Sequence, residues 1–216
     1  LMVLSVPSTP AQADEVTDLI AILESDAAAY DKDVACRRLA VVGTPAAVDA
    51  IAALLDDEQL ATSARTALDG IAGPEAARAL RSALAELSGA GLVGVIESLG
   101  TRGDTEAVPA LGRLLHSADP MAASAAAYAL GRIGGREAAE ALVDHGADKV
   151  IVAATHAILS GPAAERLNAG PFEEIIFTNT LPIPEGVESE KATVLSVAPL
   201  LAQAIHEVFE DGSVAS

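Results

Sequence analysis

The side chains best suited to chemistry lie in the last third of the sequence. His156 and the triplet Thr178-Asn179-Thr180 each follow a short run of β-branched residues. We expect both at the carboxyl ends of strands, where parallel sheets bind their ligands. The hydroxyls and the amide of the triplet could meet a phosphate, but hydrogen bonds that form a turn explain it equally well. His156 lacks a positioned partner in the sequence, so loop packing is the preferred interpretation for it.

Arginines recur once or twice in every thirty residues of the first 135. Four of them could line one ridge that receives an acidic partner: Arg37, Arg65, Arg102 and Arg132. Their neighbours in the same pattern are Arg38, Arg78, Arg81 and Arg113. We favour the alternative that each arginine pairs with a nearby carboxylate on a solvated face, since exposed ion pairs at helical spacing are common.

The sequence predicts no metal site. Cys36 is the only cysteine, which excludes an intrachain disulfide and a zinc site built from several thiolates. We expect Cys36 to be a small buried apolar residue. His116, in the segment LLHSADP, is expected to be an inert surface residue.

The composition indicates a globular protein that does not bind nucleic acid. Apolar residues make up 51% of the chain and aromatic residues only 2%, so Ala, Leu, Val and Ile must fill the core. The net charge of -18 would repel the phosphates of a nucleic acid. No apolar run reaches the 18 or so residues that a membrane span needs.

The first thirteen residues, LMVLSVPSTPAQA, look like the end of a secretory signal. A short apolar run and two prolines precede Ala11-Gln12-Ala13, an arrangement of small residues that signal peptidase favours. The charged start of a signal is missing, so a disordered leader is the alternative. The sequence leaves the localisation open between export and the cytoplasm.

From Asp14 onward, apolar residues recur at helical spacing, and no alternating strand pattern precedes Lys149. Four leucines lie about thirty residues apart, which is the length of one helical hairpin: Leu39, Leu68, Leu99 and Leu130. About four hairpins fit between Asp14 and Gly135.

A glycine follows each of these leucines and is expected to end a helix in the left-handed conformation: Gly43, Gly73, Gly103 and Gly134. Thr44-Pro45, Pro74 and Asp104 are expected to begin the next helices. The segment AAYALGRIGG is similar to the second helix of HEAT-like repeats. This resemblance implies an α-helical solenoid over residues 14–137, whose concave face usually holds proteins or peptides.

After Gly146 the pattern changes. The β-branched runs KVIVAAT, EEIIFTNT and KATVLSVA alternate with helical segments, which predicts a parallel sheet of about three strands with crossovers. Such a small sheet exposes edge strands such as VIVAAT, so we expect marginal stability or self-association. Ser160-Gly161-Pro162 is expected to provide an N-cap and a proline in the first turn of a helix.

Four segments of this half occur in the order found at the C-terminal end of ribose-phosphate pyrophosphokinases, which they resemble: ATHAILSGPAAERL, EEIIFTNTLPIPE, TVLSVAPLLAQAI and EVFEDGSVAS. The resemblance implies a partial phosphoribosyltransferase-like domain over residues 138–216. In that family the C-terminal loop helps to bind a regulatory phosphate or nucleotide across a subunit interface. Ser213, Val214 and Ser216 are the matching residues, and Ala215 stands where a second Ser is usual.

The same resemblance implies that the catalytic parts are missing. The family's ribose-phosphate loop, an acidic pair followed by a Thr-Gly-Thr type turn, would precede residues 137–145, where this chain has ALGRIGG. Its ATP-binding region and catalytic loop would lie earlier, and residues 14–135 resemble neither. Because phosphoryl transfer needs positioned magnesium and cationic groups, we expect no turnover. Magnesium and ATP belong to this chain only by resemblance, and no cofactor is expected.

Three functional hypotheses follow. The leading one is a non-catalytic scaffold that binds a protein on the solenoid and carries a degenerate pyrophosphokinase-like tail, with the helix at residues 136–146 shared by both halves. The alternative is an accessory or regulatory partner of an intact ribose-phosphate pyrophosphokinase in nucleotide biosynthesis, joined through the C-terminal half, which could also form a homo-oligomer. The third is an active ribose-phosphate diphosphokinase.

Overall fold

The computed structural model describes residues 10–182, 186–187 and 190–209, with the backbone alone for residues 10–12. The chain divides into two compact units, Leu1–Gly134 and Gly135–Ser216. We call them the helical unit and the sheet unit. The division falls just before the predicted boundary between residues 137 and 138.

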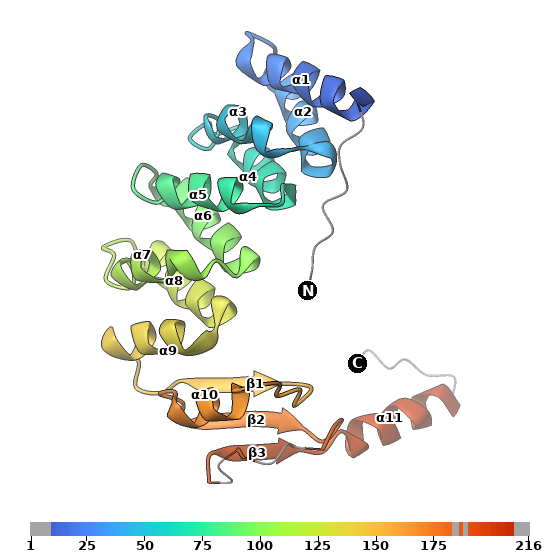
Figure 1. Cartoon of the computed structure of the whole chain (residues 1–216), viewed down its shortest axis with the longest axis vertical. Coiled ribbons are helices and arrows are strands. Elements are labelled where there is room, and N and C mark those ends of the chain that lie inside the picture. The colour runs from blue at the N-terminus through green and yellow to red at the C-terminus, as the bar shows by residue number, and fades with distance from the viewer. Residues whose placement is uncertain (1–9, 183–185, 188–189, 210–216) are drawn as a thin grey trace. The chain divides into compact units, whose positions relative to one another are not determined.

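In the described residues of the helical unit, all the regular secondary structure is helical (Figure 1). They are α1 (Pro10–Glu24), α2 (Ala29–Val42), η1 (Pro45–Ala47), α3 (Val48–Ala52), α4 (Ala61–Gly70), α5 (Pro74–Ala83), α6 (Gly89–Arg102), η2 (Thr105–Ala107), α7 (Val108–Leu114) and α8 (Pro120–Ile133). Consecutive helices pair as hairpins, and α2, α4, α6 and α8 contact one another in chain order. The unit is therefore built as two layers of helices.

The thirty-residue pattern marks the core of the helical unit. Leu39, Leu68, Leu99 and Leu130 are all fully buried. Between them the core is filled largely by small and aliphatic side chains, as the composition predicts. Cys36 is also fully buried, and burial raises the pKa of its thiol to about 11. The expectation that it is a buried apolar residue is confirmed.

The predicted role of the glycines is correct only in part. Gly103 ends α6 in the left-handed conformation, at φ 64° and ψ 36°. Gly43 is extended, at φ -60°, and a side chain there would overlap the Leu39 carbonyl oxygen and Ile71. Close approach, not conformation, therefore requires glycine at position 43. Gly73 stands at the N-cap of α5, and Gly134 has a positive φ outside the left-handed helical region.

Helix starts follow the sequence more closely. Pro45 and Pro74 are the first residues of η1 and α5. The Asp104 side chain accepts a hydrogen bond of 3.1 Å from the Glu106 backbone N–H at the start of η2. Helix α1 begins at Pro10, so the predicted signal residues Ala11–Ala13 lie within it, and residues 1–9 of the predicted leader are outside the described residues.

The sheet unit contains three parallel strands in the order β1-β2-β3. Its elements are α9 (Gly135–Asp144), β1 (Ile151–Ala154), α10 (Ala163–Ala169), β2 (Glu174–Thr178), β3 (Ala192–Leu195) and α11 (Ala198–Phe209). In the register, Ile151 lies beside Glu174 and Ile175 beside Ala192. The predicted three-stranded parallel sheet is confirmed, with β1 as an edge strand.

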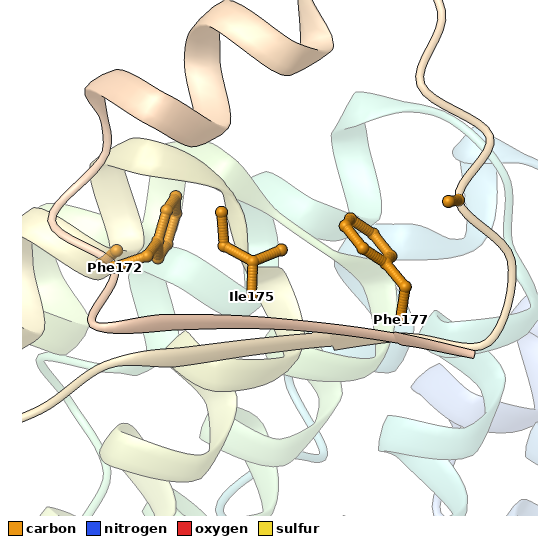
Figure 2. Close-up of a cluster of buried hydrophobic side chains, with 5 residues drawn as sticks. Phe172, Ile175 and Phe177 are labelled. Carbon is orange, nitrogen blue, oxygen red and sulfur yellow. The ribbon is translucent and has the colours of Figure 1, made fainter. Parts of the chain in front are cut away.

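A small apolar cluster holds this unit together. It contains Ala139 of α9, Ala157 and three large side chains from β2 and the turn before it, Phe172, Ile175 and Phe177. Figure 2 shows these three side chains on one side of the sheet. Alternate residues of β2 are buried there, as a strand with one packed face requires.

In the described part of the chain, no helix is both long and apolar enough to cross a membrane.

Candidate functional site

Polar side chains gather where β1 and β2 end. The hydroxyls of Thr178 and Thr180 both donate to the Thr155 carbonyl oxygen, at 2.5 and 2.8 Å. Thr180 Oγ1 also lies 2.8 Å from His156 Nδ1. The parallel pairing of β1 with β2 brings these residues together although His156 and Thr180 are 24 positions apart. The predicted location of His156 and the triplet at the carboxyl edge is confirmed.

These hydrogen bonds predict a tautomer for neutral His156. The single hydroxyl proton of Thr180 goes to the Thr155 carbonyl oxygen. The Thr180 oxygen can then act only as an acceptor toward the imidazole, so we expect Nδ1 of His156 to carry the proton and Nε2 the lone pair. His156 is exposed rather than packed in the loop, and it does have a partner, which sequence reasoning missed.

Asn179 connects the end of β2 to the start of α11. Its backbone N–H donates to the Leu195 carbonyl oxygen at 3.0 Å, and its side-chain Oδ1 accepts from the Val197 N–H at 2.9 Å. Ser196 Oγ accepts from the Ala198 N–H at 3.2 Å. The side chains of the triplet are therefore engaged mainly in long-range hydrogen bonds, to Thr155 and His156 after β1 and to Val197 before α11, and not mainly in the local turn-forming bonds that the sequence offered as the alternative. Phosphate binding by Thr178, Asn179 and Thr180 would have to compete with these bonds, and it stays a prediction.

The start of α10 differs from its prediction. Pro162 is the N-cap residue, so it lies outside the first helical turn, where the sequence placed it. Its side chain forms no capping hydrogen bond. Ser160 contributes its carbonyl oxygen, which accepts from the Ala163 N–H at 3.4 Å. Ser160 is thus the first residue of a turn and not a capping side chain.

The predicted arginine ridge separates into different kinds of contact. Arg37 pairs with Asp33 at 2.9 Å on an exposed face, as the favoured alternative expects. Arg132 lies over the Tyr128 ring, with its guanidinium carbon 6.0 Å from the centroid. Partner binding by this set of arginines stays a prediction.

Arg65 and Arg102 instead donate to backbone carbonyl oxygens of neighbouring helices. Arg65 Nη1 donates to Gly94 at 3.1 Å. Arg102 donates to four residues at the α4–α5 turn, at 2.9 to 3.2 Å: Leu68, Asp69, Ile71 and Gly73. Neither the partner-binding ridge nor the pairing with carboxylates predicts these bonds. Every residue has a backbone carbonyl oxygen, so residue types do not reveal such an acceptor.

Asp69 lies beside these two arginines. Desolvation raises the pKa of Asp69, and the 2.9 Å hydrogen bond from Ser98 together with the charges of Arg102 and Arg65 acts in the opposite direction. Among the described side chains, Arg65 Nε is buried without a hydrogen-bond partner. The α4–α6 contact therefore contains a polar network in which hydrogen bonds and opposite charges offset only part of the cost of burying Asp69 and Arg65.

The sheet unit also exposes large apolar side chains on β3 and on α11, a set of residues that we call the β3–α11 surface. Its residues are Val194, Leu195, Leu200, Leu201, Ile205, Val208 and Phe209. Exposure ranges from 49% for Val194 to 84% for Phe209. Within the described residues, α11 buries none of its side chains. An apolar patch of this kind marks an interaction site more often than a free surface.

The predicted regulatory residues Ser213, Val214 and Ser216 lie outside the described residues. In the ranges that are described, no group of three or more His, Cys, Asp or Glu side chains is placed to hold a metal ion. The segment ALGRIGG forms the end of α8, its cap Gly134 and the first residue of α9.

Two family models match overlapping parts of the chain. A phosphoribosyl synthetase-associated domain matches residues 135–216, and HEAT repeats match residues 88–160. The overlap covers α9 and β1. It includes the helix at residues 136–146 that the sequence assigns to both halves.

Part of the chain is similar to ribose-phosphate pyrophosphokinases. The enzyme of Streptomyces avermitilis is 60% identical over 79 residues, which cover 37% of this chain and 24% of the relative. That of Caldanaerobacter subterraneus is 51% identical over 78 residues, 36% of this chain and 25% of the relative. The chain thus spans about a quarter of the length of the curated relatives it matches.

Two solved structures align with different shares of the chain. Phosphoribosylpyrophosphate synthetase from Mycobacterium smegmatis covers 35% of this chain at 52% identity, with a TM-score of 0.32, and 25% of its own chain is matched. The alignment with an engineered protein covers 61% of this chain and 68% of that protein, at 24% identity and with a TM-score of 0.41.

Proposed function

We propose that this chain is a non-catalytic interaction protein that associates with ribose-phosphate pyrophosphokinase subunits through residues 138–216. The observation that carries the proposal is the exposed β3–α11 surface. It belongs to the part of the chain that matches the phosphoribosyl synthetase-associated domain. A segment that keeps up to 60% identity to such an enzyme, together with an uncovered apolar surface, is suited to contact the enzyme's own subunits.

The energetics favour a partner for this surface. Full burial of a Leu, Ile or Phe side chain contributes about 1.5–3 kcal/mol, and α11 exposes five large apolar side chains. A second copy of the chain is the less favourable partner, because each copy carries a net charge of -18 and the copies repel each other.

The absence of turnover is part of the proposal. The segment that would have to hold the ribose phosphate is helical, and phosphoryl transfer depends on groups positioned around the moving phosphate. A coupled assay for AMP release from ATP and ribose 5-phosphate tests this point. We expect no activity above the background without protein, and turnover at the rate of a pyrophosphokinase would overturn it.

The association is tested by size-exclusion chromatography with light scattering on mixtures with the purified Streptomyces avermitilis enzyme. We expect a complex that elutes ahead of the enzyme alone. The double variant Leu201→Ser/Ile205→Ser should remove it. The matched control Val34→Ser/Val41→Ser changes two exposed apolar residues on α2 and should leave the complex intact. A complex that survives the first variant would move the interface elsewhere.

A second candidate function concerns the helical unit. Its hairpins stack in chain order, and HEAT repeats match residues 88–160. This supports a HEAT-like solenoid over residues 14–137 as a protein-binding part, in addition to the association through the sheet unit. A truncated chain tests whether the two parts bind different partners. Residues 14–137 alone should bind a protein partner without binding the pyrophosphokinase.

A further inference from the structure

A groove runs between helices α3 and α5 of the helical unit, which contact each other. It consists of a hollow of about 590 Å³ and an adjoining one of about 170 Å³. Both are lined by Ala52, Ala53, Leu55, Ala83 and Glu86. Four of these five shared residues are apolar and three of them are alanines, so another segment of chain can approach closely beside Glu86.

The rim of this groove is acidic. Asp49, Asp56, Glu75 and Glu86 line the two hollows, and Arg78 is the single cation among the lining residues. Among the described residues, none of these four carboxylates forms an ion pair or accepts a hydrogen bond. Elsewhere in the helical unit, ion pairs occupy Glu15, Asp33, Asp104 and Glu106. With one arginine against four carboxylates, the charge around the groove stays negative.

We infer that the α3–α5 groove binds a basic amphipathic helix of a partner protein, with small or aliphatic residues on one face and Lys or Arg beside it. The inference rests on the helical unit being a protein-binding part and is independent of the association through the sheet unit. Charge complementarity selects the basic partner. A helix fits better than an extended strand, because the groove is walled by helices whose backbone groups are bonded internally and offer no edge for pairing.

Fluorescence anisotropy with the full chain tests this inference. The probe is a labelled 18-residue peptide of Ala, Leu and Lys that places Ala and Leu on one helical face and Lys on its flanks. Two control peptides have the same composition in scrambled order, or Glu in place of Lys. We expect saturable binding of the amphipathic Lys peptide that weakens as salt concentration rises, and no binding of the Glu peptide. Equal binding of the scrambled peptide would overturn the inference.

Two triple variants with the same change of charge locate the site. Asp49→Asn/Glu75→Gln/Glu86→Gln removes charge at the groove, and Glu24→Gln/Asp31→Asn/Glu97→Gln removes it at other exposed positions of the helical unit. Loss of three exposed ion pairs should weaken binding about tenfold in the first variant and less than about twofold in the second. Equal losses would mean non-specific attraction and would overturn the groove assignment. Such a result leaves the pyrophosphokinase association untouched, since that is measured with a different partner.

Discussion

Arg102 of α6 donates a hydrogen bond of 2.9 Å from Nη1 to the Leu68 carbonyl oxygen, near the end of α4. The last four carbonyl groups of a helix have no partner within the helix. Three further bonds from the same guanidinium reach residues between Asp69 and Gly73. Arg102, which belongs to the following hairpin, therefore supplies hydrogen bonds to the carbonyl oxygens of the α4–α5 turn. These bonds fix the spacing of the two hairpins.

Removing this side chain should destabilise the helical unit. We expect Arg102→Ala to lower the free energy of unfolding by about 2 kcal/mol, because hydrogen bonds to a charged donor contribute about 1.5–3 kcal/mol. Urea unfolding followed by circular dichroism measures the effect. Arg113→Ala, an exposed arginine on α7, is the control and should change stability by less than about 0.5 kcal/mol. Equal effects of the two variants would contradict the role of Arg102.

Asp69 gives the helical unit a pH dependence with a defined sign. Its pKa is raised in the folded chain, so between its usual value and the raised value the folded state binds more protons than the unfolded state. The contribution of Asp69 to stability is then largest at low pH and falls as pH rises through the raised pKa. Asp69→Asn should therefore be more stable than the natural chain at pH 7, with the difference shrinking toward pH 4. An unchanged difference over this range would refute the raised pKa.

The His156–Thr180 contact predicts a tautomer. In the natural chain, neutral His156 should carry its proton on Nδ1, and in Thr180→Val this preference should be lost. Long-range nitrogen–proton NMR spectra at pH 8 distinguish the two ring nitrogens. Thr17→Val, which removes a hydroxyl from α1, is the control and should leave the His156 signals unchanged. Protonation on Nε2 in the natural chain would show that Thr180 does not orient the ring.

The open edges of the sheet predict self-association. Strand β1 exposes Ile151 and strand β3 exposes Val194, and each pairs on one side only within the three-stranded sheet. At high protein and salt concentrations, where the repulsion between chains of net charge -18 is screened, the purified chain should form dimers or larger species. Val194→Lys should reduce them, because charge on an edge strand opposes pairing. A monodisperse monomer in light scattering, together with a single cooperative thermal transition, would contradict this prediction.

The sequence was most informative where side-chain pattern determines structure. Leucines at a thirty-residue spacing and three β-branched runs predict the buried positions and the strands, because apolar burial depends on side-chain type and period. The sequence was least informative where a side chain interacts with the backbone of another segment or where two segments approach closely. The carbonyl acceptors of Arg102 and the close approach at Gly43 depend on how hairpins stack, and the His156–Thr180 pair depends on the register of β1 with β2.

The β3–α11 surface escaped sequence reasoning for a related reason. The segment APLLAQAIHEVF reads as an amphipathic helix, which usually packs its apolar face on its own domain. Here the described part of the chain covers none of Leu200, Leu201, Ile205, Val208 and Phe209. Only the arrangement in space distinguishes a core helix from one whose apolar face is left exposed.

Sedimentation velocity of the chain mixed with Streptomyces avermitilis ribose-phosphate pyrophosphokinase tests the proposed association most directly. With the enzyme in excess, the slow boundary of the free chain should merge into the faster boundary of the enzyme, with an apparent Kd below about 10 µM, as expected for an interface of standard size. The Leu201→Ser/Ile205→Ser variant should sediment separately. A free boundary of the natural chain that persists at about 100 µM enzyme would contradict the association.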